Sequence, residues 1–253
     1  MKKNSLIALM TLVWLVLMAN IIWKGTDGAW KLTDVEKIAQ LEVAKYTNQI
    51  MVVTVLNEDA KLYLYERELN TVGVNEYLNM QGERKEKRHS NVAWNLVLET
   101  EANIGKNGVG KKREGDGKTP VGVFSFVKAF GILENPGAKL EYTKVNESHY
   151  WVDDSASKYY NQFVLVEEVK QDWVSAEHIL EYGESYHYVL ATSFNSERIS
   201  GAGSAVFLHC TSDEADVTAG CIAVPEVYMR EIMKRVEPQC VLIIDHVENI
   251  LSY

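Results

Sequence analysis

Two side chains that can do acyl-transfer chemistry lie close together in the stretch AVFLHCTSDEADVTAGCIAVP, residues 205–225. His209 ends an apolar run, and Cys221 opens the next apolar run after an acidic loop. A thiol is a weak nucleophile at neutral pH until a neighbour lowers its pKa or takes its proton, and histidine is the usual partner. The two residues alone leave three interpretations open: a catalytic pair, two structural residues, or a metal site.

The neighbours of this pair narrow those interpretations. Successive side chains of a strand point to opposite faces, so if His209 faces a cleft, Cys210 points into the core and is not the nucleophile. Gly220 allows a tight backbone and close approach of a substrate, and leaves backbone N–H groups free for a developing oxyanion. A zinc site through His209, Cys210 and Cys221 would lack a close pair of cysteines.

Short apolar runs separated by turns must position these residues. We expect strands at 50–57, 60–68, 91–105, 121–127, 162–169, 186–194, 204–210, 221–225 and 240–247. We expect a helix at 225–237, with Pro225 at its start and an apolar stripe of Val227, Met229, Ile232, Met233 and Val236. Many short strands and few helices predict a mainly β, sandwich-like or barrel domain.

Three other segments connect or precede these strands. Residues 33–50 have apolar positions near helical spacing, with Thr33 and Glu36 in the relation of a capping box, and predict a short helix or stalk. Residues 66–90 are polar, and we expect a connection with a short helix. The glycine-rich loop at 105–117 is a candidate lid. It does not match a phosphate-binding loop, because Pro120 follows Lys118 and Thr119 directly and disfavours a helix there.

Composition limits the class of protein. The chain has 253 residues, 47% hydrophobic content and a net charge of −9, which favours a globular domain and argues against nucleic-acid binding. The basic patch at 82–89 is interrupted by Glu83 and Glu86, and we interpret it as a solvated loop. The three cysteines do not form a disulfide scaffold; a Cys210–Cys240 bridge would leave Cys221 free.

The N-terminus carries a membrane signal. Lys2 and Lys3 precede an uncharged apolar stretch at 6–23, which at ~1.5 Å per residue is close to the thickness of a bilayer core. No small-residue cleavage site is evident, so we expect an uncleaved anchor, with a cleaved signal peptide as the alternative. The lysines predict that the remainder lies outside the cell. We therefore divide the chain into an anchor at 1–26, a juxtamembrane helix or stalk at 27–49, and a domain at 50–253 that holds the His–Cys pair.

Several motifs occur together and in order. GDGKTP at 115–120 precedes VGVFSF, WVDDSASKYYN stands at 151–161, WVSAE at 173–177, and the His–Cys stretch follows. Together they resemble the L,D-transpeptidase catalytic domain (the YkuD family), in the branch with these segments, over roughly residues 50–246. The resemblance implies a β-sandwich-like fold that holds the pair in a cleft, and no metal or other cofactor.

The resemblance also implies roles for individual residues. Cys221 would be the nucleophile and His209 the base, Gly220 and the Cys221 amide would form part of the oxyanion hole, and Thr218 would open the motif. The common form of the family has a polar residue where this chain has Ala219, and another two residues after the cysteine. Whatever those two polar side chains contribute to substrate binding or to the rigidity of the motif must come from other residues in this chain. The group that orients the histidine ring in such families is often a backbone carbonyl.

The implied substrate is the stem peptide of peptidoglycan. Cys221 would form an acyl-enzyme with release of D-alanine and pass the acyl group to an amine, crosslinking or remodelling the wall. Alternatives are a carboxypeptidase or amidopeptidase that only hydrolyses, and a wall-binding module without catalysis.

Five further residues have two interpretations each. Asp153, Asp154 and Glu177 would either bind the ammonium groups of the stem or order loops. Trp151 and Trp173 would either be core residues or substrate platforms.

Overall fold

The computed structural model describes residues 35–78, 84–212 and 217–253, with the side chains of 69–92 left out. Within these ranges, thirteen strands form three sheets. The first sheet has the order β3-β2-β1-β13-β4, with β1 (Gln49–Leu56), β2 (Asp59–Leu78), β3 (Arg84–Ala102), β4 (Gly122–Phe124) and β13 (Val241–His246). The second has the order β12-β11-β10-β5-β6, with β5 (Phe126–Gly131), β6 (Tyr142–Lys144), β10 (Val189–Thr192), β11 (Phe207–Cys210) and β12 (Ile222–Val224).

The third sheet and the helices are short. The sheet has the order β8-β7-β9, with β7 (His149–Val152), β8 (Gln162–Leu165) and β9 (Ala176–His178). The helices are α2 (Val35–Ile38), α3 (Glu226–Arg235) and the 3-10 segments η1 (Glu42–Lys45), η2 (Ile179–Tyr186) and η3 (Val247–Ser252). The prediction of a mainly β domain with few helices is confirmed.

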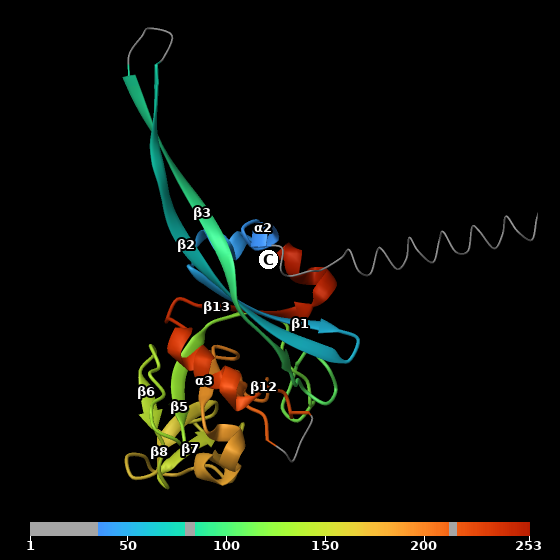
Figure 1. The fold of residues 1–253 in the computed structure, drawn as a ribbon. Coiled ribbons are helices and arrows are strands. Elements are labelled where there is room, and N and C mark those ends of the chain that lie inside the picture. The colour runs from blue at the N-terminus through green and yellow to red at the C-terminus, as the bar shows by residue number, and fades with distance from the viewer. Residues whose placement is uncertain (1–34, 79–83, 213–216) are drawn as a thin grey trace, which may run out of the picture.

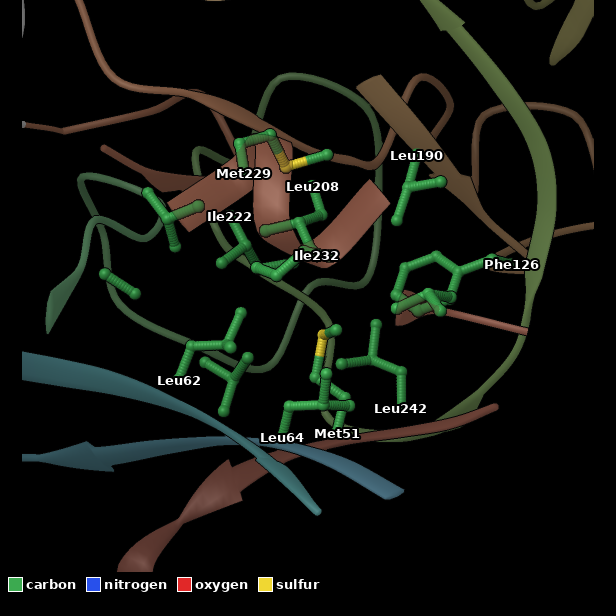
Figure 2. Close-up of a cluster of buried hydrophobic side chains, with 14 of the residues drawn as sticks. Met51, Leu62, Leu64, Phe126, Leu190, Leu208, Ile222, Met229, Ile232 and Leu242 are labelled. Carbon is green, nitrogen blue, oxygen red and sulfur yellow. The ribbon is translucent and has the colours of Figure 1, made fainter. Parts of the chain in front are cut away.

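The largest hydrophobic core lies between the first two sheets and beside α3. Figure 2 shows Met51 and Leu64 of the first sheet on one side, Leu190 and Leu208 of the second sheet on the other, and Ile232 of α3 between them. All five side chains are at most 1% exposed. This sandwich core fixes the inner faces of both sheets, and with them the direction of every outward side chain.

Strand β1 is buried on both faces. Met51 and Val53 point into the sandwich core, while Ile50 and Val52 point into a second cluster under α2, η1 and η3. The segment expected to be a helix or stalk contributes Ile38, Leu41 and Ala44 to that second cluster, as a four-residue helix and a 3-10 turn. The described residues 35–49 therefore pack against the first sheet, where the Glu42 amide also donates to the Tyr253 carbonyl.

The second and third strands continue far beyond the sandwich. Figure 1 shows β2 and β3 as a two-stranded ribbon that projects away from the body of the molecule. Residues 59–66 of β2 pair with both β1 and β3, the Arg67 amide still donates to the Asn48 carbonyl, and the rest of β2 pairs with β3. The short helix expected within 66–90 is therefore wrong for the described residues, which are strand up to Leu78 and again from Arg84. The loop expected at 82–89 is likewise wrong from Arg84 onward. The sequence did not predict these strand extensions, because the alternation of apolar and polar residues is expected only where a strand packs on a core.

The other predicted elements differ in detail. The strand expected at 121–127 is two strands in different sheets, since the chain passes from β4 to β5 at Ser125. In α3 the expected apolar stripe is buried except for Val227, which is 57% exposed. The strands β6, β7 and β9 and the 3-10 segments η2 and η3 were not predicted.

Over the described residues, no helix is long and apolar enough to cross a membrane. The anchor predicted at 6–23, the division at residue 26 and the Thr33 cap lie outside the described residues.

The sandwich core predicts an unequal response to truncation. Leu64→Ala removes a fully buried side chain and should lower the free energy of unfolding by about 2–5 kcal/mol. Val127→Ala, on the exposed side of β5, is the matched control and should change it by about 0.5 kcal/mol or less. Urea unfolding followed by circular dichroism measures both; equal losses would contradict this core.

Candidate active site

Strand β11 sends its side chains alternately into two different environments. Leu208 and Cys210 point into the sandwich core, and Cys210 is fully buried with its Sγ 3.8 Å from the carbonyl oxygen of Tyr188. Phe207 points the other way, into a cluster that also contains Tyr186. The predicted inward direction of Cys210 is confirmed.

His209 lies on the same outer side of β11 and is held there by its own strand. Its ring packs edge-on against Tyr186, with centroids 5.4 Å apart, and its Nδ1 lies 2.8 Å from the carbonyl oxygen of Cys210. That contact assigns the proton of the neutral ring to Nδ1 and leaves Nε2 as the basic nitrogen. The backbone carbonyl expected to orient the histidine is thus that of the next residue.

The surroundings of His209 favour its neutral form. Burial lowers the pKa of the ring to about 4, and hydrogen bonding to the backbone of Cys210 and Ser185 only partly offsets this effect. At neutral pH the ring is therefore a free base. Once it has taken a proton, the same backbone groups stabilise the resulting cation.

Cys221 stands just before β12, beside the start of β11. Its Sγ donates to the carbonyl oxygen of Ala205 at 3.1 Å and accepts from the N–H of Phe207 at 3.3 Å. Burial, and next the charge of Glu177, raise the pKa of this thiol to about 12. The resting nucleophile is a neutral thiol whose proton points to a carbonyl rather than to His209.

The residues before Cys221 are fixed by Thr218. Its hydroxyl donates to the carbonyl oxygen of Cys221 at 2.7 Å and accepts from the N–H of Gly220 at 3.1 Å. Its amide donates to the carbonyl oxygen of Ile104, and its carbonyl accepts from the N–H of Lys106. The Gly220 amide thus donates to Thr218, and the role expected for Gly220 at the oxyanion hole stays a prediction.

Gly220 needs to be glycine for two reasons. Its φ of +148° belongs to the region that side chains rarely adopt, and a Cβ there would lie 2.8 Å from the carbonyl oxygen of Lys118. The close approach of the two loops at this point depends on the absence of that atom.

His209 and Cys221 line one cavity of about 530 Å³. Its walls include Thr218, Ala219, Gly220 and Ala223 around the cysteine, and the charged residues Lys111, Glu114, Asp153 and Glu177. A cavity of this size holds a ligand as large as a short peptide segment.

Glu177, on β9, faces the cavity as a protonated acid. Its Oε2 accepts from the hydroxyl of Tyr186 at 2.8 Å, which places Tyr186 between Glu177 and His209. Burial, opposed by the Tyr186 hydrogen bond and assisted by the charge of Asp153, raises the pKa of Glu177 to about 8. Glu177 therefore carries a proton at neutral pH.

Asp153 offers an unused acceptor. It follows β7, and its Oδ1 is buried without a hydrogen-bond partner among the described residues. Buried polar atoms are nearly always paired, so an unpaired carboxylate oxygen in a cavity is typical of a ligand contact. Glu114 is different: its Oε1 accepts from the hydroxyls of Ser204, at 2.5 Å, and Tyr160.

Three of the five residues with two interpretations make structural contacts. Trp173 is 5% exposed, packs edge-on against Tyr159 and does not line the cavity, so its assignment as a substrate contact is replaced by the core alternative. Asp154 accepts from the amides of Ala156 and Val174 and orders two loops. Trp151 is also a core residue, stacked on Phe130.

The structure contains neither the disulfide nor the metal arrangement considered for the cysteines, over the residues that it describes. All three thiols are free, and Cys240 is a buried thiol at the start of β13. Across the described ranges, no three His, Cys, Asp or Glu side chains gather in a metal-binding arrangement.

Sequence reasoning missed Tyr186 and Lys111. Tyr186 lies in a 3-10 segment that has no periodic signature, so no pattern could have found it. Lys111 was visible only as one of several basic residues in the glycine-rich loop.

The raised pKa of Glu177 predicts how stability depends on pH. The folded state keeps the proton up to about pH 8 while the unfolded chain loses it near 4.5, so stability should fall as pH rises through that window. Glu177→Gln should remove this part of the loss, seen as a flatter plot of Tm against pH between 5 and 9. The exposed Glu168→Gln should keep the wild-type slope. Parallel plots for all three proteins would refute the buried acid.

Comparison with known proteins agrees with this geometry. No curated protein matches the sequence. The family profile described as "L,D-transpeptidase catalytic domain" (YkuD) matches residues 84–244, from β3 to β13 and including His209 and Cys221. Because that match covers more than half of the chain, the protein belongs to the L,D-transpeptidase catalytic domain family.

Proposed function

We propose that this protein is a cysteine acyltransferase that acts on peptidoglycan stem peptides and transfers them to an amine, as an L,D-transpeptidase. The observation that carries the proposal is the shared cavity of Cys221 and His209, with the basic Nε2 of the histidine set by the Cys210 carbonyl. Membership in the family supports the substrate class.

In the first half-reaction the thiol turns from the Ala205 carbonyl toward His209. Nε2 takes the thiol proton, Sγ attacks the carbonyl carbon of the third stem residue, and a tetrahedral oxyanion forms. We assign the Cys221 N–H as an oxyanion donor, because the Gly220 amide is bonded to Thr218. The carbon–nitrogen bond then breaks, and D-alanine leaves with the proton from His209.

In the second half-reaction the thioester passes its acyl group to an amine of a neighbouring stem. His209 takes a proton from that amine, nitrogen attacks the thioester carbon, and the carbon–sulfur bond breaks as the proton returns to the thiol. With water in place of the amine, the same steps give a carboxypeptidase.

The acidic wall of the cavity suits the third stem residue, a diamino acid. Its side-chain ammonium would donate to the unpaired Oδ1 of Asp153, beside the carboxyl of Glu177. We propose these two residues as the ammonium subsite. The cation would also neutralise the Asp153 charge, which otherwise raises the pKa of Glu177.

We further propose that residues 6–23 hold the protein in the cell membrane, with the catalytic domain on the cell-wall side. Support comes from the sequence, in which Lys2 and Lys3 precede the apolar stretch, and from the location of peptidoglycan outside the membrane.

The proposed reaction requires both Cys221 and His209. Full-length protein incubated with muropeptides that carry tetrapeptide stems should release D-alanine and form crosslinked dimers, both measured by mass spectrometry. Cys221→Ala and His209→Ala should each lower D-alanine release at least about a thousandfold, because nucleophile and base act as one unit.

Cys240→Ala is the control for loss of a thiol. Cys240 is buried next to β13 and does not line the cavity, so this variant should retain activity. Release of D-alanine without dimers, even with added acceptor amine, would identify a hydrolase instead. Equal products from wild type and Cys221→Ala would show that the protein is no enzyme of this kind. If Cys221→Ala then binds peptidoglycan as well as wild type does, the protein is a wall-binding module.

The ammonium subsite predicts a substrate-dependent effect. Asp153→Asn should raise KM about tenfold for stems with a free side-chain ammonium, through loss of a charge-assisted hydrogen bond. It should leave KM unchanged for stems whose ammonium is acetylated. Steady-state kinetics on both substrates test this, and an equal change in KM for both would place the ammonium elsewhere.

A further inference from the structure

Lys111 is a buried cation whose side chain runs past one glycine and ends at another, the residue before the nucleophile. Its side chain is only 4% exposed. A Cβ on Gly203 would lie 2.6 Å from its Cε, and a Cβ on Gly220 would lie 3.3 Å from its Nζ. Both glycines have positive φ, +119° and +148°. The lysine therefore passes Gly203 and ends its ammonium group against the residue that precedes Cys221.

Asp116 holds that ammonium in place. Its Oδ1 lies 3.1 Å from Lys111 Nζ and also accepts from the N–H of Lys118, while its Oδ2 accepts from the amides of Lys112 and Arg113. Although burial raises the pKa of Asp116, these hydrogen bonds outweigh it and hold the pKa well below its ordinary value. Three backbone amides donate to the Asp116 carboxylate and offset part of its negative charge. The carboxylate still holds the Lys111 ammonium in place.

The nucleophile needs a cation that its nearest neighbours do not supply. His209 is neutral in the resting site, because its pKa is lowered to about 4 by burial. Ala219 and Ala223 carry no polar side chain. Lys111 lines the same cavity as Cys221, and its charge lowers the pKa of the thiol.

The other groups that face the thiol add no competing cation. The charge of Glu177 acts against the thiolate, but this acid keeps its proton up to about pH 8. Burial raises the pKa of Tyr182 and Tyr186, so both hydroxyls stay neutral in the physiological range.

We propose that the Lys111 ammonium is the electrostatic partner of Cys221 and stabilises its thiolate. Lys111 acts through Cys221 and does not take part in proton transfer. The inference rests on the proposed function insofar as Cys221 is the nucleophile. It also explains why Gly203 has no side chain, since a Cβ there would collide with the stem of the lysine.

The test measures thiol reactivity without any peptidoglycan. Iodoacetamide is reacted with the full-length protein at pH 7 to 10, and alkylation of the Cys221 peptide is followed by mass spectrometry. A charge lost next to a thiolate shifts its pKa by about one unit or more. Lys111→Met should therefore alkylate about tenfold more slowly at each pH below the thiol pKa, with the whole pH profile displaced upward.

Two variants separate charge from structure. Lys111→Arg keeps the cation and should restore most of the wild-type rate, while Lys112→Met removes an exposed lysine of the same loop and should change nothing. A Lys111→Met protein that folds, by near-ultraviolet circular dichroism, and alkylates at the wild-type rate would overturn the proposal.

Asp116→Asn provides a second route if Lys111→Met does not fold. It retains the lysine and an oxygen acceptor but removes the counter-charge, so alkylation of Cys221 should become faster. Unchanged or slower alkylation would overturn the proposal. The proposed function is judged separately by D-alanine release: a slower alkylation in Lys111→Met without any D-alanine from wild type would keep the electrostatic role and remove the reaction.

Discussion

The burial of β11 on both faces is the constraint on which the site depends. The sandwich core requires Leu208 and Cys210 on one side, and the cluster around Tyr186 requires Phe207 on the other. His209 consequently points to the outer side and cannot exchange places with Cys210, because a slip of one residue would turn every side chain of the strand over. The parallel pairing of β11 with β12 then brings the start of β12, and Cys221, beside it.

A second constraint fixes the loop before the cysteine. Thr218 connects this loop to Ile104 and Lys106, and Gly220 lets the carbonyl of Lys118 come close. The glycine-rich loop thus forms one wall of the cavity, rather than only a cover over it. Its Asp116 binds three of the loop's own amides, so the loop is internally ordered.

The site stores its reactive groups in neutral form. Burial raises the pKa of Cys221, lowers that of His209 and raises that of Glu177, and in each case the uncharged species is favoured. We therefore expect the proton to pass from Cys221 to His209, which creates a thiolate and an imidazolium, only when a substrate is bound. A fixed cation nearby lowers the cost of that step, and Lys111 is placed to provide it.

Much of this arrangement could be predicted from the sequence, and what could not has physical reasons. The alternation around His209 gave the direction of Cys210 because both faces of the strand are apolar. The long ribbon of β2 and β3 escaped prediction, since its sequence lacks the regular alternation of apolar and polar residues that identifies a strand. The roles of Lys111, Tyr186 and the Gly220 amide depend on contacts between distant segments, which spacing along the chain does not encode. Trp173 could not be assigned because a buried tryptophan and a substrate platform have the same signature in a sequence.

The central claim is that Cys221 is an activated acyl acceptor, and a carbapenem tests it most directly, since its strained amide carbonyl offers a thiolate an acyl group. Intact-mass spectrometry of the full-length protein after carbapenem exposure should show one added carbapenem mass, located on the Cys221 peptide and absent from Cys221→Ala. An unmodified wild-type protein, or the same adduct on Cys221→Ala, would contradict the account.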